Sequence, residues 1–146
     1  MKLDLPRDIS AYPWRTEIQT RFGDLDVHAH LNNVSIARLF EETRVRSNHH
    51  FKELIPGFQP FQFVMANLHI DFLAEGKYPA PVVVGQGIIH VGTSSFASGM
   101  AMFQGDICLA LCQSVLVHRT EQGSTPLPQA LRERLAEMTL VNGDLR

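Results

Sequence analysis

The stretch Phe22–Arg46, FGDLDVHAHLNNVSIARLFEETRVR, decides the fold, because it joins an acidic, histidine-rich loop directly to the one long helix that the chain predicts. A carboxylate held opposite the free N–H groups of a helix start can attack or hydrate a carbonyl whose oxygen those groups polarise. We therefore expect the chemistry of the protein at the junction between this loop and this helix.

The helix itself is expected to be a core element. Asn32 or Asn33 provides a favourable N-cap. Apolar residues then recur at helical spacing and predict a helix buried on most sides: Val34, Ile36, Ala37, Leu39, Phe40 and Thr43. Arg38, Glu42 and Arg46 lie four apart on another line, where each exposed ion pair is worth roughly a few tenths of a kcal/mol.

The rest of the chain predicts an antiparallel sheet. A first strand is expected from Trp14 to Phe22, and four more follow the helix with no second long helix between them: residues 62–73, 81–91, 94–104 and 107–118. In residues 62–73 the even positions from 64 to 72 are apolar, so we expect them to face the helix. A short helix through about Met138 completes an α+β domain.

Composition favours one compact domain over residues 1–146, because the chain is 45% hydrophobic and shows no compositional break. Thirteen basic side chains are balanced by fifteen acidic ones, and no run of Lys and Arg forms a basic stripe. Nucleic acid is therefore not an expected partner. No apolar run approaches the roughly 20 residues of a membrane span, and the polar N-terminus does not resemble a secretory signal. We therefore expect a cytoplasmic protein without membrane association.

Nine residues between Phe22 and Arg44 recur in one known pattern: Asp24, Asp26, His30, Asn32, Asn33, Phe40, Glu41, Glu42 and Arg44. The stretch resembles the hotdog-fold thioesterases of the 4-hydroxybenzoyl-CoA thioesterase family, whose pattern is close to F-x-D-x-D-x-x-G-H-V-N-N-x-x-Y-x-x-x-F-E-E-A-R. Residues 66–73, 92–96 and 126–128 also resemble segments of that family. The resemblance implies a hotdog fold, in which a curved antiparallel β-sheet wraps around one long central α-helix.

The resemblance further implies an acyl thioesterase that hydrolyses acyl-CoA or acyl-carrier-protein thioesters. It places the catalytic carboxylate, as nucleophile or general base, at Asp26 and the polarising backbone N–H near Asn33. Substrate contacts are implied at His30, Asn32 and Ser94. No metal and no cofactor are implied, and the active site is expected where two subunits of a homodimer or homotetramer meet.

An aromatic cluster follows the helix and is a candidate lining for the acyl group. Phe58, Phe61 and Phe63, with Met65 beside them, offer flexible and aromatic surface for an apolar tail or ring. Phe61 and Phe63 are accordingly candidate substrate-binding residues, and core packing is the alternative explanation. If the cluster lines the acyl pocket, thioesters with medium, long or aromatic acyl groups are expected to be hydrolysed faster than acetyl-CoA.

Other sites and functions remain open from the sequence. Some hotdog thioesterases carry the working carboxylate on the central helix, where Glu41 and Glu42 lie. A hotdog dehydratase would bring His30 into one pocket with Glu41 or Glu42, and a non-catalytic acyl-binding module would have Asp26 blocked by side chains. Ala29 stands where the family pattern has glycine, and Ile36 replaces its customary aromatic residue.

Overall fold

The computed structural model describes residues 2–59 and 62–141. The strands are β1 (Trp14–Ile18), β2 (Phe63–Phe72), β3 (Val82–Val91), β4 (Ser95–Gln104), β5 (Ile107–Thr120) and β6 (Gly123–Ser124). The helices are α1 (Asn33–Leu54) and α2 (Gln129–Glu137), with short 3-10 helices η1 (Ile9–Ala11) and η2 (Phe22–Asp24). None of the helices in this described part of the chain is long and apolar enough to cross a membrane.

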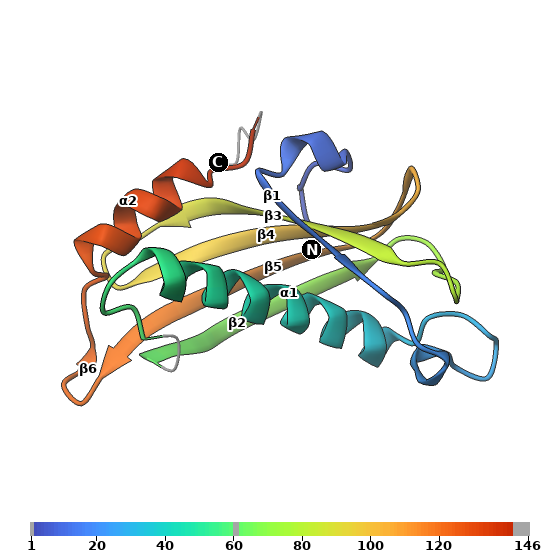
Figure 1. Ribbon diagram of the computed structural model, residues 1–146, viewed down its shortest axis with the longest axis horizontal. Coiled ribbons are helices and arrows are strands. Elements are labelled where there is room, and N and C mark those ends of the chain that lie inside the picture. Colours follow the sequence, from blue (N-terminus) through green and yellow to red (C-terminus); the bar gives the residue numbers. More distant parts are fainter. Residues whose placement is uncertain (1, 60–61, 142–146) are drawn as a thin grey trace.

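The strands form one antiparallel sheet in the order β1-β3-β4-β5-β2, with β6 paired to the end of β5. Helix α1 lies lengthwise across one face of this sheet, and α2 lies near the C-terminal end of α1 (Figure 1). The two edges of the sheet are β1 and β2. This is the α+β hotdog architecture that the sequence predicts.

The inner face of the sheet buries one side of α1 in two apolar clusters. The expected burial of the helix on most sides is wrong for the single chain, where Val34 is exposed. Towards the start of α1, Ile36, Leu39 and Phe40 pack on residues of β3, β4 and β5. Towards its end, Phe51 and Ile55 pack with Ile88 and Phe96 of the sheet and Leu131 and Leu135 of α2. Between these clusters lies a layer of buried polar side chains: Thr43, Arg44 and Ser47 on α1, and Gln86, Ser98 and Ser114 on the sheet.

The outer face of the sheet is covered by the N-terminal segment, to which the sequence had assigned no role. Leu3, Leu5 and Tyr12 pack there against Ala101, Phe103 and Leu111. The Leu3 N–H also donates to Asp71 Oδ2 of β2 over 2.6 Å. The segment therefore closes a second core on the side of the sheet away from α1.

Two expected strands differ from the sequence prediction. The first strand ends at Ile18 rather than Phe22, because the Asp24 carboxylate accepts the Arg21 N–H at 2.8 Å and starts η2 instead. In β2 a bulge between Met65 and Asn67 shifts the alternation. Phe63 therefore packs on the inner cluster.

The expected burial of the even positions of β2 is wrong for the single chain. The side chains of Val64, Leu68 and Phe72 remain largely exposed. The reason is position, because β2 is an edge strand and has a neighbour, β5, on one side only. Ile70 alone among these apolar residues joins the cluster under the start of α1.

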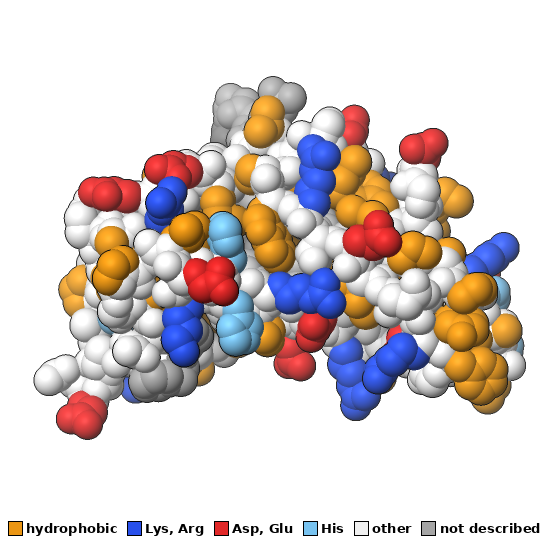
Figure 2. Space-filling view, viewed as in Figure 1, with side chains coloured by type: hydrophobic (Ala, Val, Ile, Leu, Met, Phe, Trp, Pro, Cys, Tyr) orange, Lys and Arg blue, Asp and Glu red, His pale blue; other side chains and the backbone are white. Residues whose placement is uncertain are grey.

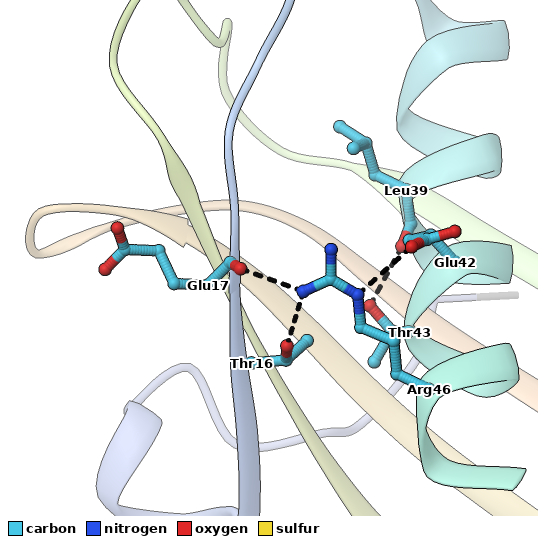
Figure 3. Close-up of polar contacts among 6 residues, drawn as sticks. All are labelled: Thr16, Glu17, Leu39, Glu42, Thr43 and Arg46. Atoms are coloured by element: carbon cyan, nitrogen blue, oxygen red, sulfur yellow. Dashed lines mark hydrogen bonds and ion pairs between the residues drawn. The ribbon is translucent and has the colours of Figure 1, made fainter. Parts of the chain in front are cut away.

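The opposite edge, β1, is tied to α1 by Arg46 (Figure 3). Its Nη1 donates to Thr16 Oγ1 and to the Glu17 carbonyl oxygen, each over 3.0 Å. Its Nε donates to Glu42 Oε1 over 3.1 Å, which confirms one ion pair that the helical spacing predicts. The Arg46 guanidinium thus donates to a main-chain carbonyl of β1, which is only five residues long.

Packing of the N-terminal segment depends on the absence of a side chain at Gly85. A Cβ added to Gly85 would lie 2.6 Å from both Cβ and Cγ of Tyr12. Because Tyr12 Cβ moves only with the backbone, Gly85→Ala is expected to lower the free energy of unfolding by about 1–3 kcal/mol. Thermal melting measures this loss. Gly23→Ala is the control, since nothing lies within 4 Å of its added Cβ; equal melting of both variants would contradict this packing.

Candidate active site

The loop before α1 is closed by Asp26 and its own backbone. The Asp26 N–H donates to the His30 carbonyl over 2.9 Å, and Asp26 Oδ1 accepts the N–H groups of His28 at 2.9 Å and His30 at 3.2 Å. Ala29 adopts a left-handed backbone with φ of 60°, which costs an L-residue about 1–2 kcal/mol. The family pattern has glycine at this position, where the cost does not arise.

These hydrogen bonds also set the charge of Asp26. The bond from the His30 N–H is the largest influence and lowers the pKa of Asp26 below its ordinary value, desolvation opposes it, and the His28 N–H lowers the pKa further. Hydrogen bonds to the charged form stabilise a carboxylate. Asp26 is therefore an anion at neutral pH, with Oδ1 engaged by two N–H groups.

The start of α1 supplies hydrogen-bond donors beside this carboxylate. Asn32 is the N-cap, and its Oδ1 accepts the Val34 N–H at 2.8 Å. Its own N–H donates to the Asp24 carbonyl over 2.8 Å, which ties the helix start to the loop. Asn33 is the first helical residue, and its N–H donates to no other residue in the described ranges. Such a free N–H at the positive end of a helix is suited to a developing negative charge.

Asp26 and Asn33 line a common hollow of about 420 Å³, called here the polar hollow. Its walls are Asp26, His28, His30, Leu31, Asn33, Ile36, Phe72, Leu73, Ala74 and Glu75. His30 Nε2 lies 3.1 Å from Glu75 Oε2 across it. Three of the residues implied by the resemblance, Asp26, His30 and Asn33, are thus brought together.

A second hollow of about 730 Å³, the apolar hollow, opens beside the first and shares Asp26 with it. It is lined by Phe22, Leu25, Asp26, Val27, Ala29 and Asn32. Asp26 is therefore reachable from two directions, and no described side chain blocks it as the non-catalytic alternative would require. Asn32, also implied by the resemblance, faces this second hollow.

The remaining candidate residues lie elsewhere in the single chain. The Phe63 ring packs on Phe58 and Phe96 near the end of α1, and Ser94 lies in the turn between β3 and β4, where its carbonyl accepts the His118 N–H. The 22 residues of α1 span roughly 33 Å at 1.5 Å per residue. Both residues are thus at the far end of the helix from Asp26. Phe61 lies outside the described residues.

The helix carboxylates Glu41 and Glu42 line a different groove, of about 350 Å³, between α1 and β1. They share it with Asp24, which is buried and bonded to the Arg21 backbone and side chain. His30 pairs with Glu75 instead, so the described chain does not show the pocket of His30 with Glu41 or Glu42 that would favour a dehydratase. Asp24 holds the loop, as a structural acceptor does.

Two polar residues near candidate site segments were missed by the sequence analysis. Glu75 follows β2 and meets His30 only through the fold, and Arg132 of α2 donates to the carbonyls of Gly92 and Thr93. Arg132 places a guanidinium beside a turn whose own sequence contains no Lys or Arg. Neither residue lies in a recognisable motif, so no local signal could have identified it.

A curved antiparallel sheet around one long central helix is the architecture of the hotdog-fold thioester hydrolases. Residues 20–135 match a family model described as the thioesterase-like superfamily. The chain therefore belongs to the thioesterase-like superfamily. No curated protein sequence matches it significantly.

Solved structures agree with this assignment. A thioesterase from Thermus thermophilus, complexed with coenzyme A and Zn, is 27% identical, with a TM-score of 0.78 over 88% of this chain and 95% of that one. A predicted thioesterase from Bacillus stearothermophilus is 24% identical, with a TM-score of 0.79 over 89% of this chain and 98% of that one. The likeness to the Bacillus stearothermophilus structure supports the fold alone.

The lowered pKa of Asp26 predicts how activity depends on pH. A reaction that needs the carboxylate loses rate only as pH falls through a pKa below the ordinary value of 3.8. We expect that titration of Asp26 causes no loss of kcat/KM above about pH 5, a pH well above the ordinary aspartate pKa. Rates and melting temperatures measured across the same pH series separate titration from unfolding. Such a loss between about pH 5 and 7 in a folded protein would assign the reaction to another group.

Proposed function

We propose that the protein is an acyl thioesterase that hydrolyses acyl-CoA or acyl-carrier-protein thioesters, using Asp26 and the start of α1. One observation carries the proposal: Asp26 and Asn33, the first residue of α1, line the same hollow. Thioester hydrolysis needs a base or nucleophile on one side of the carbonyl and a donor where the oxygen becomes negative. A cytoplasmic location remains our expectation for such an enzyme.

Two chemical routes are compatible with this arrangement. As a general base, Asp26 takes a proton from water while the oxygen of that water adds to the carbonyl carbon, and the oxyanion is held by the Asn33 N–H. The carbon–sulfur bond then breaks, and the thiolate takes up the proton. As a nucleophile, Asp26 itself displaces the thiolate to form an anhydride, which water hydrolyses to the acid and free Asp26. Because Oδ1 is engaged by two N–H groups, Oδ2 is the reacting oxygen in either route.

Coenzyme A is the carrier favoured by two observations. The Thermus thermophilus thioesterase is complexed with coenzyme A, and Arg132 beside the turn between β3 and β4 offers positive charge for phosphates. An acyl carrier protein shares the pantetheine arm. A panel of acyl-CoA and acyl-carrier thioesters with free-thiol detection tests the function and the carrier together.

Asp26→Asn tests the catalytic residue. The substitution keeps the size and most of the hydrogen bonding but removes the charge, so folding should survive while kcat falls by about 10²–10⁴. Melting temperature and kcat on the best thioester of the panel are the measurements. An Asp26→Asn protein that melts normally and keeps more than about a third of wild-type kcat, far above that range, would remove Asp26 from the mechanism.

Two further variants serve as controls for Asp26→Asn. Glu41→Gln, in the groove on the other side of α1, should change kcat far less, and a collapse there would move the chemistry to the helix. Asp24→Asn should also lose far less kcat. It is expected to melt earlier, because buried Asp24 accepts both the Arg21 N–H and its guanidinium.

We also propose a homodimer, or a homotetramer built from it, joined through β2. The β1 edge is short and bonded by Arg46, whereas β2 has ten residues and exposes Val64, Leu68 and Phe72. Free edges of this kind pair with another chain. Antiparallel pairing of two β2 strands about a twofold axis brings the Phe63 end of one next to the Phe72 end of the other. Phe63 and Ser94 of one subunit then approach Asp26 of the other.

Leu68→Lys tests this assembly. A lysine at the exposed Leu68 leaves the single chain intact but puts like charges near the twofold axis, so sedimentation should shift from dimer or larger to monomer. Ile107→Lys is the matched control, because Ile107 is also exposed but pairs with Gln104 of β4, beyond the part of β5 that pairs with β2. Wild-type protein that sediments only as monomer at micromolar concentration would exclude a shared site.

A further inference from the structure

We propose that the acyl group of the thioester lies in the apolar hollow beside Asp26, against Phe22 and Val27, while the pantetheine arm leaves through the polar hollow. The inference rests on the proposed thioesterase function and makes its substrates apolar acyl thioesters. It also makes Phe22 and Val27 the residues that determine acyl specificity. Nothing in the sequence motif assigns them this role.

The two hollows differ in chemistry on either side of the residue that they share. The polar hollow presents two histidines, Asn33 and Glu75 in addition to Asp26, and the other five of its ten lining residues are apolar. In the apolar hollow Asp26 is the only charged residue, and four of its six lining residues are Phe22, Leu25, Val27 and Ala29. A thioester is two-sided in the same way, because its acyl tail needs apolar surface and its pantetheine amides need hydrogen-bond partners. Binding across Asp26 with the acyl tail in the apolar hollow and the pantetheine amides in the polar hollow therefore satisfies both parts of the substrate.

The exposure of the apolar lining supports a ligand there. Phe22 is 76% exposed and Val27 is 96% exposed, so neither contributes to the core. The Phe22 ring meets Tyr78 edge-on with centroids 6.2 Å apart, which extends the apolar surface to the loop after β2. Hydrophobic side chains gather at this end of the molecule (Figure 2), where the loop between β1 and α1 lies in Figure 1. Contiguous exposed apolar surface of this kind marks a binding site.

The loop fixes these side chains relative to the carboxylate through its backbone. Phe22 opens η2, which is capped by the Arg21 and Asp24 contacts, and Leu25 pairs with Leu31 in an isolated bridge. Val27 directly follows Asp26. Since main-chain bonds hold the loop, truncating Phe22 or Val27 removes ligand surface without removing a core contact.

The aromatic cluster at Phe63 is the competing location for the acyl group. Its rings are in contact with one another: Phe63 with Phe58 at 5.5 Å, with Phe96 at 5.8 Å and with His118 at 5.1 Å between centroids. Phe58 is buried in the cluster under α1. This contact network is what core packing produces, and an acyl group would reach it only from Asp26 of another subunit.

The experiment measures kcat/KM for acetyl-, hexanoyl- and dodecanoyl-CoA in wild type and in the double variant Phe22→Ala/Val27→Ala. Wild type should prefer the longer chains. The double variant should lower the ratio of dodecanoyl to acetyl by about tenfold or more, the change that a pocket shows for losing even one methylene contact. Leu54→Ala, an exposed apolar residue at the opposite end of α1 from both hollows, should keep the wild-type ratio.

Each other outcome overturns the inference. A ratio that stays unchanged in the double variant, or falls in Phe63→Ala instead, places the acyl group elsewhere. Loss of the dimer in the double variant, seen by sedimentation, shows that this surface is a subunit interface. Absence of hydrolysis for every thioester in wild type would refute the proposed function itself, which is a separate result from a changed ratio.

Discussion

Burial of one side of α1 against the inner face of the sheet is the constraint on which the rest of the structure depends. Apolar clusters at both ends of the helix fix its position. The layer between them is polar, and the described residues leave Arg44 Nη1, Gln86 Oε1 and Ser114 Oγ there without a partner. Each such group costs about 1–3 kcal/mol when it stays unpaired, so the apolar clusters must supply the net stability of this interface.

A fixed helix also fixes its first turn, and that turn carries the electrostatics of the site. Asn33 and Phe72 line the polar hollow together, and the loop before α1 folds back so that Asp26 lines the same hollow. The hydrogen bonds that shape the loop are the ones that keep Asp26 ionised. Local structure and candidate chemistry therefore have a common cause.

The sequence predicted those features that depend on short-range spacing. The N-cap, which the sequence left open between Asn32 and Asn33, the Glu42–Arg46 pair and the loop around Asp26 all involve residues at most four apart. It could not place residues whose neighbours are distant. The bulge that turns Phe63 inward is set by pairing with β5, and the His30–Glu75 contact joins segments 45 residues apart in sequence.

The same reasoning explains why an apolar alternation was misleading in β2. Alternation marks two faces of a strand but does not say whether a neighbour covers either face. In β2 the apolar face lies at a sheet edge, so its residues stay exposed in one chain. The alternation in β2 therefore fits the proposed contact between two subunits rather than the core of a single subunit.

Closure of the loop by main-chain bonds separates folding from specificity in this site. Because Asp26 and the backbone hold the loop, the side chains of Val27, His28 and Ala29 face outward and contribute little to packing. One departure from the family pattern, Ala29 in place of glycine, falls among them, next to the bulk of His28. Ile36, the other departure, is buried yet also lines the polar hollow. Substitutions can therefore reshape both hollows around Asp26 while leaving the carboxylate and the helix start in place.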